Sequence, residues 1–397
     1  VQLLVERLER LLGVLGLLHR SHNKLQRNGW LSSAIILYIV VAYASLIWTN
    51  QKFITAKQLF IFTMVCLALS YAVRCFSDRD VAWLAILGLG TYFAVGLAAE
   101  IALGTSRPWM PGYRSSGTGH PNGTALELAV LFIACVTMAK DKQLRGILLP
   151  IAFFTLLALV LTRSRTSLAG AVLAPIVFGI LTLRRYNKFV ILLMLVTAAC
   201  LFVLIGDALT PVLEKGALLG RRDTTIEQAK SLTGRTDLWH ELLSNDFPKS
   251  PLLGYGFNSF WTVENVERVG RAVNFRATTA HSAYVDALIG LGPLGLAAYL
   301  FAYLFGIRRC VVYFNATRDP VHLFFGSILV YVLLHGTTES GFLFAGITTF
   351  VAMAILAKLG FQQPPEAVAA SENPPRGVNP LNPAPAAPTK AAVPPNT

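Results

Sequence analysis

A histidine and several arginines lie where this chain changes between polar and apolar sequence. His281 closes a long polar segment and is followed at once by an apolar run, while Arg165 opens another apolar run and Arg235 lies in the polar segment. A histidine exchanges protons near neutral pH, and the planar arginine fork matches phosphate oxygens. This combination suits proton transfer beside an anionic, lipid-linked substrate at a membrane surface.

The composition is that of a membrane protein. Of 397 residues, 54% are hydrophobic and 14% are charged, and the mean hydropathy is +0.56. Soluble domains average roughly 25% charged residues. The net charge of +13 follows from basic loops on one side of the membrane, so it calls for no nucleic-acid partner.

Apolar runs long enough to cross a bilayer predict an all-α polytopic fold. Residues 1–30 are interpreted as an amphipathic interfacial segment or the remnant of a first span, 207–282 as a large outer loop and 361–397 as a disordered Pro- and Ala-rich tail. Residues 31–206 hold seven spans and residues 283–360 three. The ten predicted spans are 31–49, 57–73, 81–104, 123–139, 146–162, 166–183, 189–206, 283–306, 321–338 and 341–359.

The distribution of Lys and Arg over the short loops predicts that both termini are cytoplasmic and that the large loop lies outside. This rule leaves the outer arginines unexplained. Arg163 and Arg165 stand between two spans with almost no loop. They either reach lipid phosphates or point inward to a bound anion.

Two further outer segments hold candidates. Arg114, His120 and Asn122 lie in an irregular Gly- and Pro-rich loop, where they face a substrate or serve turn chemistry. Arg235 stands at a predicted helix start with Thr233 or Thr236 as its cap. A cation there opposes the helix dipole, which favours either an external anion or a neighbouring carboxylate.

Among the histidines, His335 is the rival of His281 as a base, because Glu339 follows it by one helical turn. Asp286 lies well round the helix from His281 and is not an obvious orienting partner. His322, at an inner helix end, suits a solvated role. The sequence shows no tight His, Asp and Glu cluster, and its cysteines lie outside the large loop, so no metal site is predicted.

Several short motifs, taken in order, resemble the O-antigen ligase family of inner-membrane glycosyltransferases. The resemblance covers roughly residues 31–359. The motifs are Pro121-Asn122 with Ala125, Ser164-Arg165, Thr233-Gly234-Arg235 with Leu238-Trp239, the turn from Pro251 to Gly256, and His281-Ser282 followed by Gly290, Gly292 and Gly295.

The resemblance implies a fold of the membrane glycosyltransferase C class with about 10–12 transmembrane helices, in the bacterial inner membrane. It implies transfer of polysaccharide from undecaprenyl diphosphate to a hydroxyl of lipid A–core on the periplasmic face. The transfer would invert the anomeric centre and need neither metal nor cofactor. The roles implied are a base for His281, diphosphate binding for Arg165, Arg235, Arg222 and Arg114, and support from Arg163, His120, Asn122, His335 and Glu339.

Related chemistries share these features. An O-antigen polymerase uses the same donor with a second lipid-linked glycan as acceptor, and a protein O-oligosaccharyltransferase uses a Ser or Thr hydroxyl. A transporter is disfavoured, because coupled transporters place ionisable residues near the bilayer midplane. Here Glu100, Glu127, Asp286 and His335 all lie towards the outer ends of the predicted spans.

Overall fold

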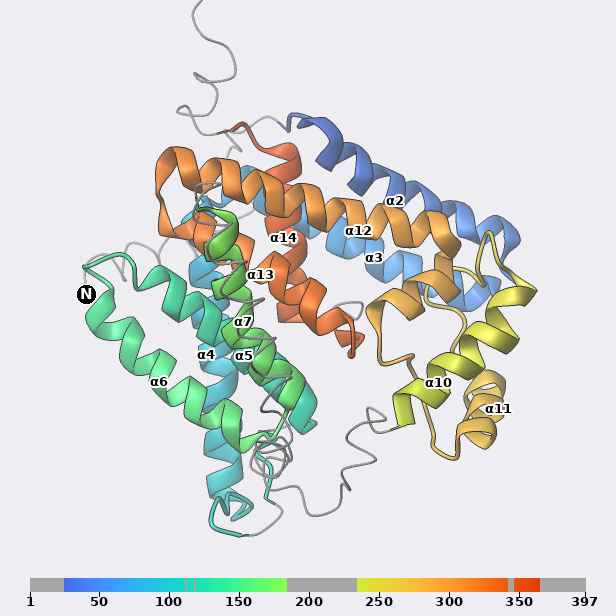
Figure 1. Cartoon of the computed structure of the whole chain (residues 1–397), viewed down its shortest axis with the longest axis horizontal. Helices are drawn as coiled ribbons and strands as arrows, with labels where there is room; N and C mark the ends of the chain where they lie inside the picture. The colour runs from blue at the N-terminus through green and yellow to red at the C-terminus, as the bar shows by residue number, and fades with distance from the viewer. Residues whose placement is uncertain (1–24, 111–112, 118, 184–233, 342–345, 365–397) are drawn as a thin grey trace, which may run out of the picture.

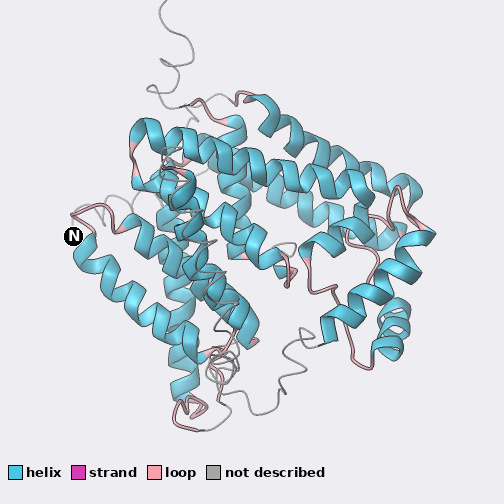
Figure 2. Cartoon of the chain, in the orientation of Figure 1, coloured by secondary structure: helices cyan, strands magenta, loops and turns pink. Residues whose placement is uncertain are grey.

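The computed structural model describes residues 25–110, 113–117, 119–183, 234–341 and 346–364. Figure 2 shows helices joined by loops, without a strand in these ranges. This confirms the all-α fold of a polytopic membrane protein. Residues 1–24 of the predicted N-terminal segment, the span at 189–206 and most of the predicted tail lie outside the described residues.

Five helices of the described chain are long and apolar enough to cross a membrane, and four shorter apolar helices accompany them. The long helices are α2 (Gly29–Trp48), α3 (Lys52–Cys75), α4 (Asp78–Ala102), α5 (Pro121–Met138) and α12 (Ala283–Thr317). The shorter helices are α6 (Arg145–Leu161), α7 (Arg165–Leu181), α13 (Pro320–Gly336) and α14 (Ile347–Phe361). Each overlaps a predicted span.

Two helices depart from the predicted limits. Helix α12 continues to Thr317, beyond the predicted end of the span at 306, because Cys310 and Tyr313 still pack into the core. Helix α14 begins at Ile347 rather than at 341. Gly346, in extended conformation, directly precedes the helix, and glycine has a low helix propensity.

The helices pack around a core centred on α5 and α13. Helix α2 runs along α12, α13 packs against α7 and α12, and α5 lies against α4, α6 and α7 (Figure 1). Tyr331, Phe324 and Phe325 of α13 are fully buried. On the outside, Ile47 and Phe53 are 81% and 84% exposed, as expected of side chains that face lipid.

The described part of the large loop forms a small helical unit with its own core. It contains α10 (Arg235–Glu241), the turns η2 (Leu242–Asp246) and η3 (Phe247–Lys249), and α11 (Val263–Val273). Leu238, Phe260 and Val269 pack together with Ile289 of α12. The unit rests on the end of α2, where Trp48 donates through Nε1 to the Leu253 carbonyl at 3.1 Å.

A backbone-to-backbone contact joins this unit to α12. Pro293 has no N–H to offer the Ile289 carbonyl, which instead accepts from Tyr255 N at 2.9 Å. Gly292 has φ 66° and Gly254 has φ 68°. A Cβ on Gly292 would lie 2.2 Å from the Leu252 carbonyl oxygen. The glycine-rich turn, Gly290 and Gly292 therefore belong to one contact at the break in α12, whereas Gly295 packs against Leu291 of the same helix.

The opposite end of the bundle is held by buried charges. Asp78 lies 3.3 Å from Lys358 Nζ and 3.5 Å from His322 Nε2. Lys358 is 2% exposed and His322 3%. The expectation of a solvated His322 is therefore wrong, because a carboxylate on α4 draws this ring into the interface.

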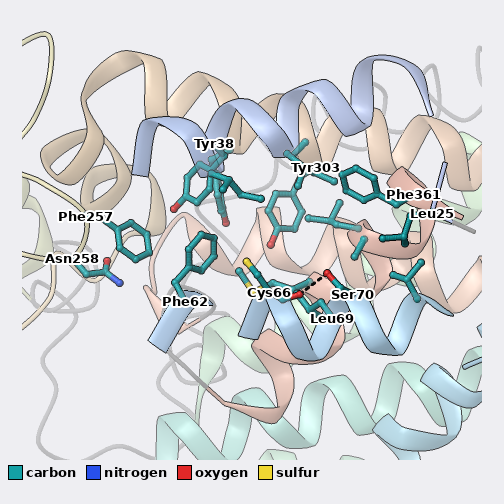
Figure 3. A pocket seen from close by; sticks show the side chains of 18 residues that line it. Leu25, Tyr38, Phe62, Cys66, Leu69, Ser70, Phe257, Asn258, Tyr303 and Phe361 are labelled. Atoms are coloured by element: carbon teal, nitrogen blue, oxygen red, sulfur yellow. Dashed lines mark hydrogen bonds between the residues drawn. The ribbon is translucent and has the colours of Figure 1, made fainter. Parts of the chain in front are cut away.

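An apolar cavity of about 270 Å³ lies between α2, α3, α12 and α14. In Figure 3, Phe257 and Asn258 border one end and Leu25 and Phe361 the other. Tyr38 and Tyr303 lie between them. The cavity separates the α2–α12 pair from α3 over part of the membrane depth.

Candidate active site

One carboxylate gathers side chains from distant parts of the chain. Glu339, three residues after the end of α13, accepts from Arg235 Nη2 at 2.6 Å and from Asn122 Nδ2 at 3.3 Å through Oε1. Its Oε2 lies 3.5 Å from His281 Nδ1. The ends of α5, α10, α12 and α13 thus meet at a single acidic group, and this set is called the Glu339 cluster.

His281 combines access with a fixed backbone. Its side chain is 35% exposed, and its φ of 49° lies in the left-handed region. Such a conformation costs a non-glycine residue about 1–3 kcal/mol and persists only where surrounding contacts enforce it. With Nδ1 turned to Glu339, Nε2 is the ring nitrogen left to accept a proton. The Nδ1 contact is long, as hydrogen bonds at such sites often are before substrate binds.

Arg235 is the first residue of α10, directly after Gly234 with φ 81°. The predicted helix start is confirmed, but Thr236 lies inside the helix and does not cap it, since Gly234 occupies the cap position. Thr233 lies outside the described residues. A cation at a helix N-terminus is unfavourable unless an anion lies beside it. Glu339 is the carboxylate that pairs with Arg235.

The carboxyl group of Glu339 is held in its charged form. Burial raises its pKa, but the hydrogen bond from His281 and the charge of Arg235 outweigh burial and leave the pKa below its ordinary value. A permanent carboxylate beside Nδ1 favours the neutral tautomer with the proton on Nδ1. That tautomer presents a basic Nε2.

A second pair of arginines lies beside the cluster. Arg114 donates through Nη2 to Asn122 Oδ1 at 2.7 Å and through Nε to the Thr162 carbonyl at 2.8 Å. Burial, and then the positive charge of Arg163, lower the pKa of Arg114. Like charges held near each other and partly buried favour an anion between them.

The start of α7 borders the same place. Arg165 is its first residue, and the next residue, Thr166, accepts a hydrogen bond from Thr338 Oγ1 at 3.1 Å. Ser167 contacts His335 Nε2 at 3.3 Å. The N-terminus of a helix carries partial positive charge. Arg165 and this helix end therefore bring positive charge next to the residue that precedes Glu339.

Asp286 supports the cluster from behind. It accepts from Trp261 Nε1 at 2.8 Å, from Ala280 N at 3.1 Å and from the Ser340 hydroxyl. Ala280 and Ser340 are the neighbours of His281 and Glu339 in the chain. Asp286 was not predicted to orient His281, yet it holds the Ala280 backbone and the Ser340 side chain on either side of the His281–Glu339 contact. Sequence spacing carried no sign of this role.

The other predicted candidates are placed as follows. His335 is 2% exposed, which leaves it inaccessible as a base in this conformation. The N–H of Glu339 bonds to the His335 carbonyl at 3.0 Å, so one turn does join them although α13 ends at Gly336. His120 caps α5 by accepting from Asn122 N at 3.2 Å, which is turn chemistry. Arg222 lies outside the described residues.

The arrangement places an accessible imidazole, a carboxylate beside it and several guanidinium groups at one end of the bundle. It suits attack by a hydroxyl on a carbon whose leaving group is anionic. Within the described ranges, no three His, Cys, Asp or Glu side chains are grouped so as to hold a metal ion.

Comparison with known families identifies residues 150–300 as matching the model for O-antigen ligase. The match includes Arg165, Arg235 and His281, and it confirms the resemblance seen in the motifs. Asn122 and Glu339 fall outside it. No curated protein matches the chain.

Proposed function

We propose that the protein transfers a glycan from undecaprenyl diphosphate to a hydroxyl of lipid A–core, because residues 150–300 match the O-antigen ligase model. The Glu339 cluster carries this proposal: one carboxylate contacts both the accessible His281 and Arg235. Base and cation are thereby held within reach of one substrate.

The acceptor hydroxyl attacks the anomeric carbon while His281 Nε2 takes its proton. The carbon–oxygen bond to the diphosphate breaks on the opposite face, and its electron pair leaves with the diphosphate oxygen. Attack from the opposite face inverts the anomeric centre. General base catalysis of this kind contributes about 10²–10⁴-fold.

The growing charge on the leaving diphosphate is stabilised by Arg165 and Arg235, with Arg114 and Arg163 beside them. Arg222, outside the described residues, remains a candidate for the same role. Each charge-assisted contact is worth about 1.5–3 kcal/mol. Arginines preorganised at the developing charge take the part that a divalent cation plays in other transferases. We propose that the reaction needs no metal.

The proposed setting is the bacterial inner membrane, with the Glu339 cluster on the periplasmic side and both termini in the cytoplasm. Donor and acceptor are both amphiphiles. A site at the ends of the spans meets their headgroups while their chains stay in the bilayer. We also propose that the fold belongs to the membrane glycosyltransferase C class. The chain would divide into the interfacial segment, the membrane spans, the outer loop and the tail given in the sequence analysis.

A polymerase acting on two lipid-linked glycans is the second candidate, since it would use the same cations and the same donor. A protein O-oligosaccharyltransferase is the third. The choice among them rests on the acceptor.

The test is an in vitro transfer assay with the purified full chain, undecaprenyl-diphosphate-linked glycan and three acceptors offered separately. These are lipid A–core, a second lipid-linked glycan and a Ser-containing pilin-like peptide. Transfer to lipid A–core is expected, unchanged by EDTA. Transfer only to another acceptor would replace the ligase reading, and activity restored specifically by a divalent cation would overturn the metal-free mechanism.

A further inference from the structure

A second pocket lies at the end of the bundle opposite the Glu339 cluster. It has a volume of about 670 Å³, within the range of roughly 300–1,000 Å³ typical of ligand sites. It is bordered by the start of α2 and the later part of α12. Arg308 in its wall follows Pro293 by 15 residues of α12, which is roughly 22 Å along the helix beyond its kink at Gly292.

The pocket is basic. Arg27, Arg308 and Arg309 line it, and among the residues that the structure describes its lining contains no Asp or Glu. Arg309 is fixed, because it donates to the Asn28 carbonyl at 2.9 Å and to the Tyr313 hydroxyl at 2.8 Å. Arg27 and Arg308 are exposed. Three cations in one concave surface without a carboxylate favour an anionic ligand.

The surroundings belong to a membrane interface. Trp30 lines the same pocket and is 75% exposed, in the first turn of a helix that can span the membrane. Tryptophan collects at the headgroup level of bilayers. Phe305 and Leu31 add apolar wall. The arginines of the pocket can therefore contact a lipid headgroup, and its apolar side chains can contact the acyl chains of the same lipid.

We propose that this pocket, here named the arginine pocket, binds the phosphate of an anionic phospholipid. Basic pockets between membrane helices recognise such headgroups. Arginines that merely follow the orientation rule would stand on an open, convex surface, whereas these line a hollow with a tryptophan at its edge. The proposal goes beyond glycan transfer and does not depend on it.

The experiment measures binding of a short-chain fluorescent phosphatidylglycerol to the full chain in detergent micelles. The test variant is Arg27→Ala/Arg308→Ala, which leaves the fixed Arg309 in place. The matched control is Arg74→Ala/Lys140→Ala, which removes two exposed cations at the same end of the bundle, outside the pocket. Phosphatidylcholine and inorganic phosphate are tested as competitors.

The test variant is expected to bind about thirty-fold more weakly, at about 1 kcal/mol for each arginine near the lipid charge. The control should change less than about threefold, and neither competitor should displace the probe. Equal losses in both variants would show unspecific charge attraction and overturn the proposal. Displacement by inorganic phosphate alone would make a soluble anion the ligand instead of a lipid.

Should the double alanine variant fail to fold, Arg27→Gln/Arg308→Gln replaces it. Monodisperse elution and an unchanged thermal midpoint report the fold. Unchanged binding in a folded glutamine variant would equally refute the site.

Discussion

Replacing Glu339 by Gln tests the proposed orientation of the base. The change keeps the size of the side chain and an oxygen for Asn122 and Arg235, but it removes the charge. Charge-assisted hydrogen bonds contribute about 1.5–3 kcal/mol and neutral ones about 0.5–1.5. Since Arg235 and Glu339 are only 16% and 14% exposed, we expect a loss of about 1–2 kcal/mol in unfolding free energy.

The effect on catalysis should be larger. Without the carboxylate, the imidazole of His281 loses its preference for the tautomer with a basic Nε2. We expect kcat to fall about 100-fold or more, the lower part of the range for general base catalysis. The KM for the donor should stay level or fall, because Arg235 is released from its carboxylate to bind diphosphate.

The pH dependence of stability provides a second readout. The folded pKa of Glu339 lies below its ordinary value, so its ionised form stabilises the fold. This contribution is complete above the unfolded pKa of about 4.3 and is lost as the pH falls through the lower folded pKa. The stability gap between wild type and Glu339→Gln should therefore be constant near neutral pH and close in acid.

Transfer kinetics and chemical unfolding measure these effects. Asp237→Asn is the matched control, because it removes an exposed carboxylate from the first turn of α10, outside the cluster. A folded Glu339→Gln enzyme whose kcat lies within threefold of wild type would refute the reasoning. So would a stability gap that widens in acid.

Three further predictions follow from the same geometry. Arg235→Ala should lower kcat/KM about 10- to 150-fold, matching one lost contact of about 1.5–3 kcal/mol, and Arg235→Lys should recover only part; equal rates for both would exclude the paired arginine geometry. Asp286→Asn should lower kcat about tenfold at unchanged donor KM and add little to Glu339→Gln; fully additive losses in the double variant would contradict a shared role. Gly254→Ala places a Cβ 2.6 Å from the Gly290 carbonyl and should lower the thermal midpoint, whereas Gly104→Ala, with φ 65° and open space, should lower it less; equal shifts would argue against the contact.

The sequence predicted which residues lie near the ends of the apolar helices, because the limits of an apolar run mark the limits of a span. The described helices overlap their predicted spans, and Arg235, His281, Asn122 and Arg114 were all placed at one outer surface. Their convergence on Glu339 depends on which helices pack next to one another. Hydropathy shows where a residue lies across the membrane, but not which helices are neighbours. Glu339 was noticed only through its one-turn spacing from His335, while its contacts with Asn122 and Arg235 join segments far apart in the chain.

One interpretation failed because a tertiary contact overrode a local signal. His322 was expected in solvent because it stands at a helix end, but it is buried beside the Asp78 carboxylate of α4. Helix α12 continues past the predicted end of its span at 306, because Cys310 and Tyr313 still pack into the core. The motif glycines were recognised as a pattern, and only the contact between Leu252 and Gly292 shows what the pattern builds.

The most direct test of the central claim compares wild type with His281→Ala in single-turnover transfer from undecaprenyl-diphosphate-linked glycan to lipid A–core. We expect glycan on the core with wild type, in EDTA as well, and a loss of about 10²–10⁴-fold in the variant at unchanged donor binding. A folded His281→Ala enzyme that transfers at the wild-type rate would contradict it.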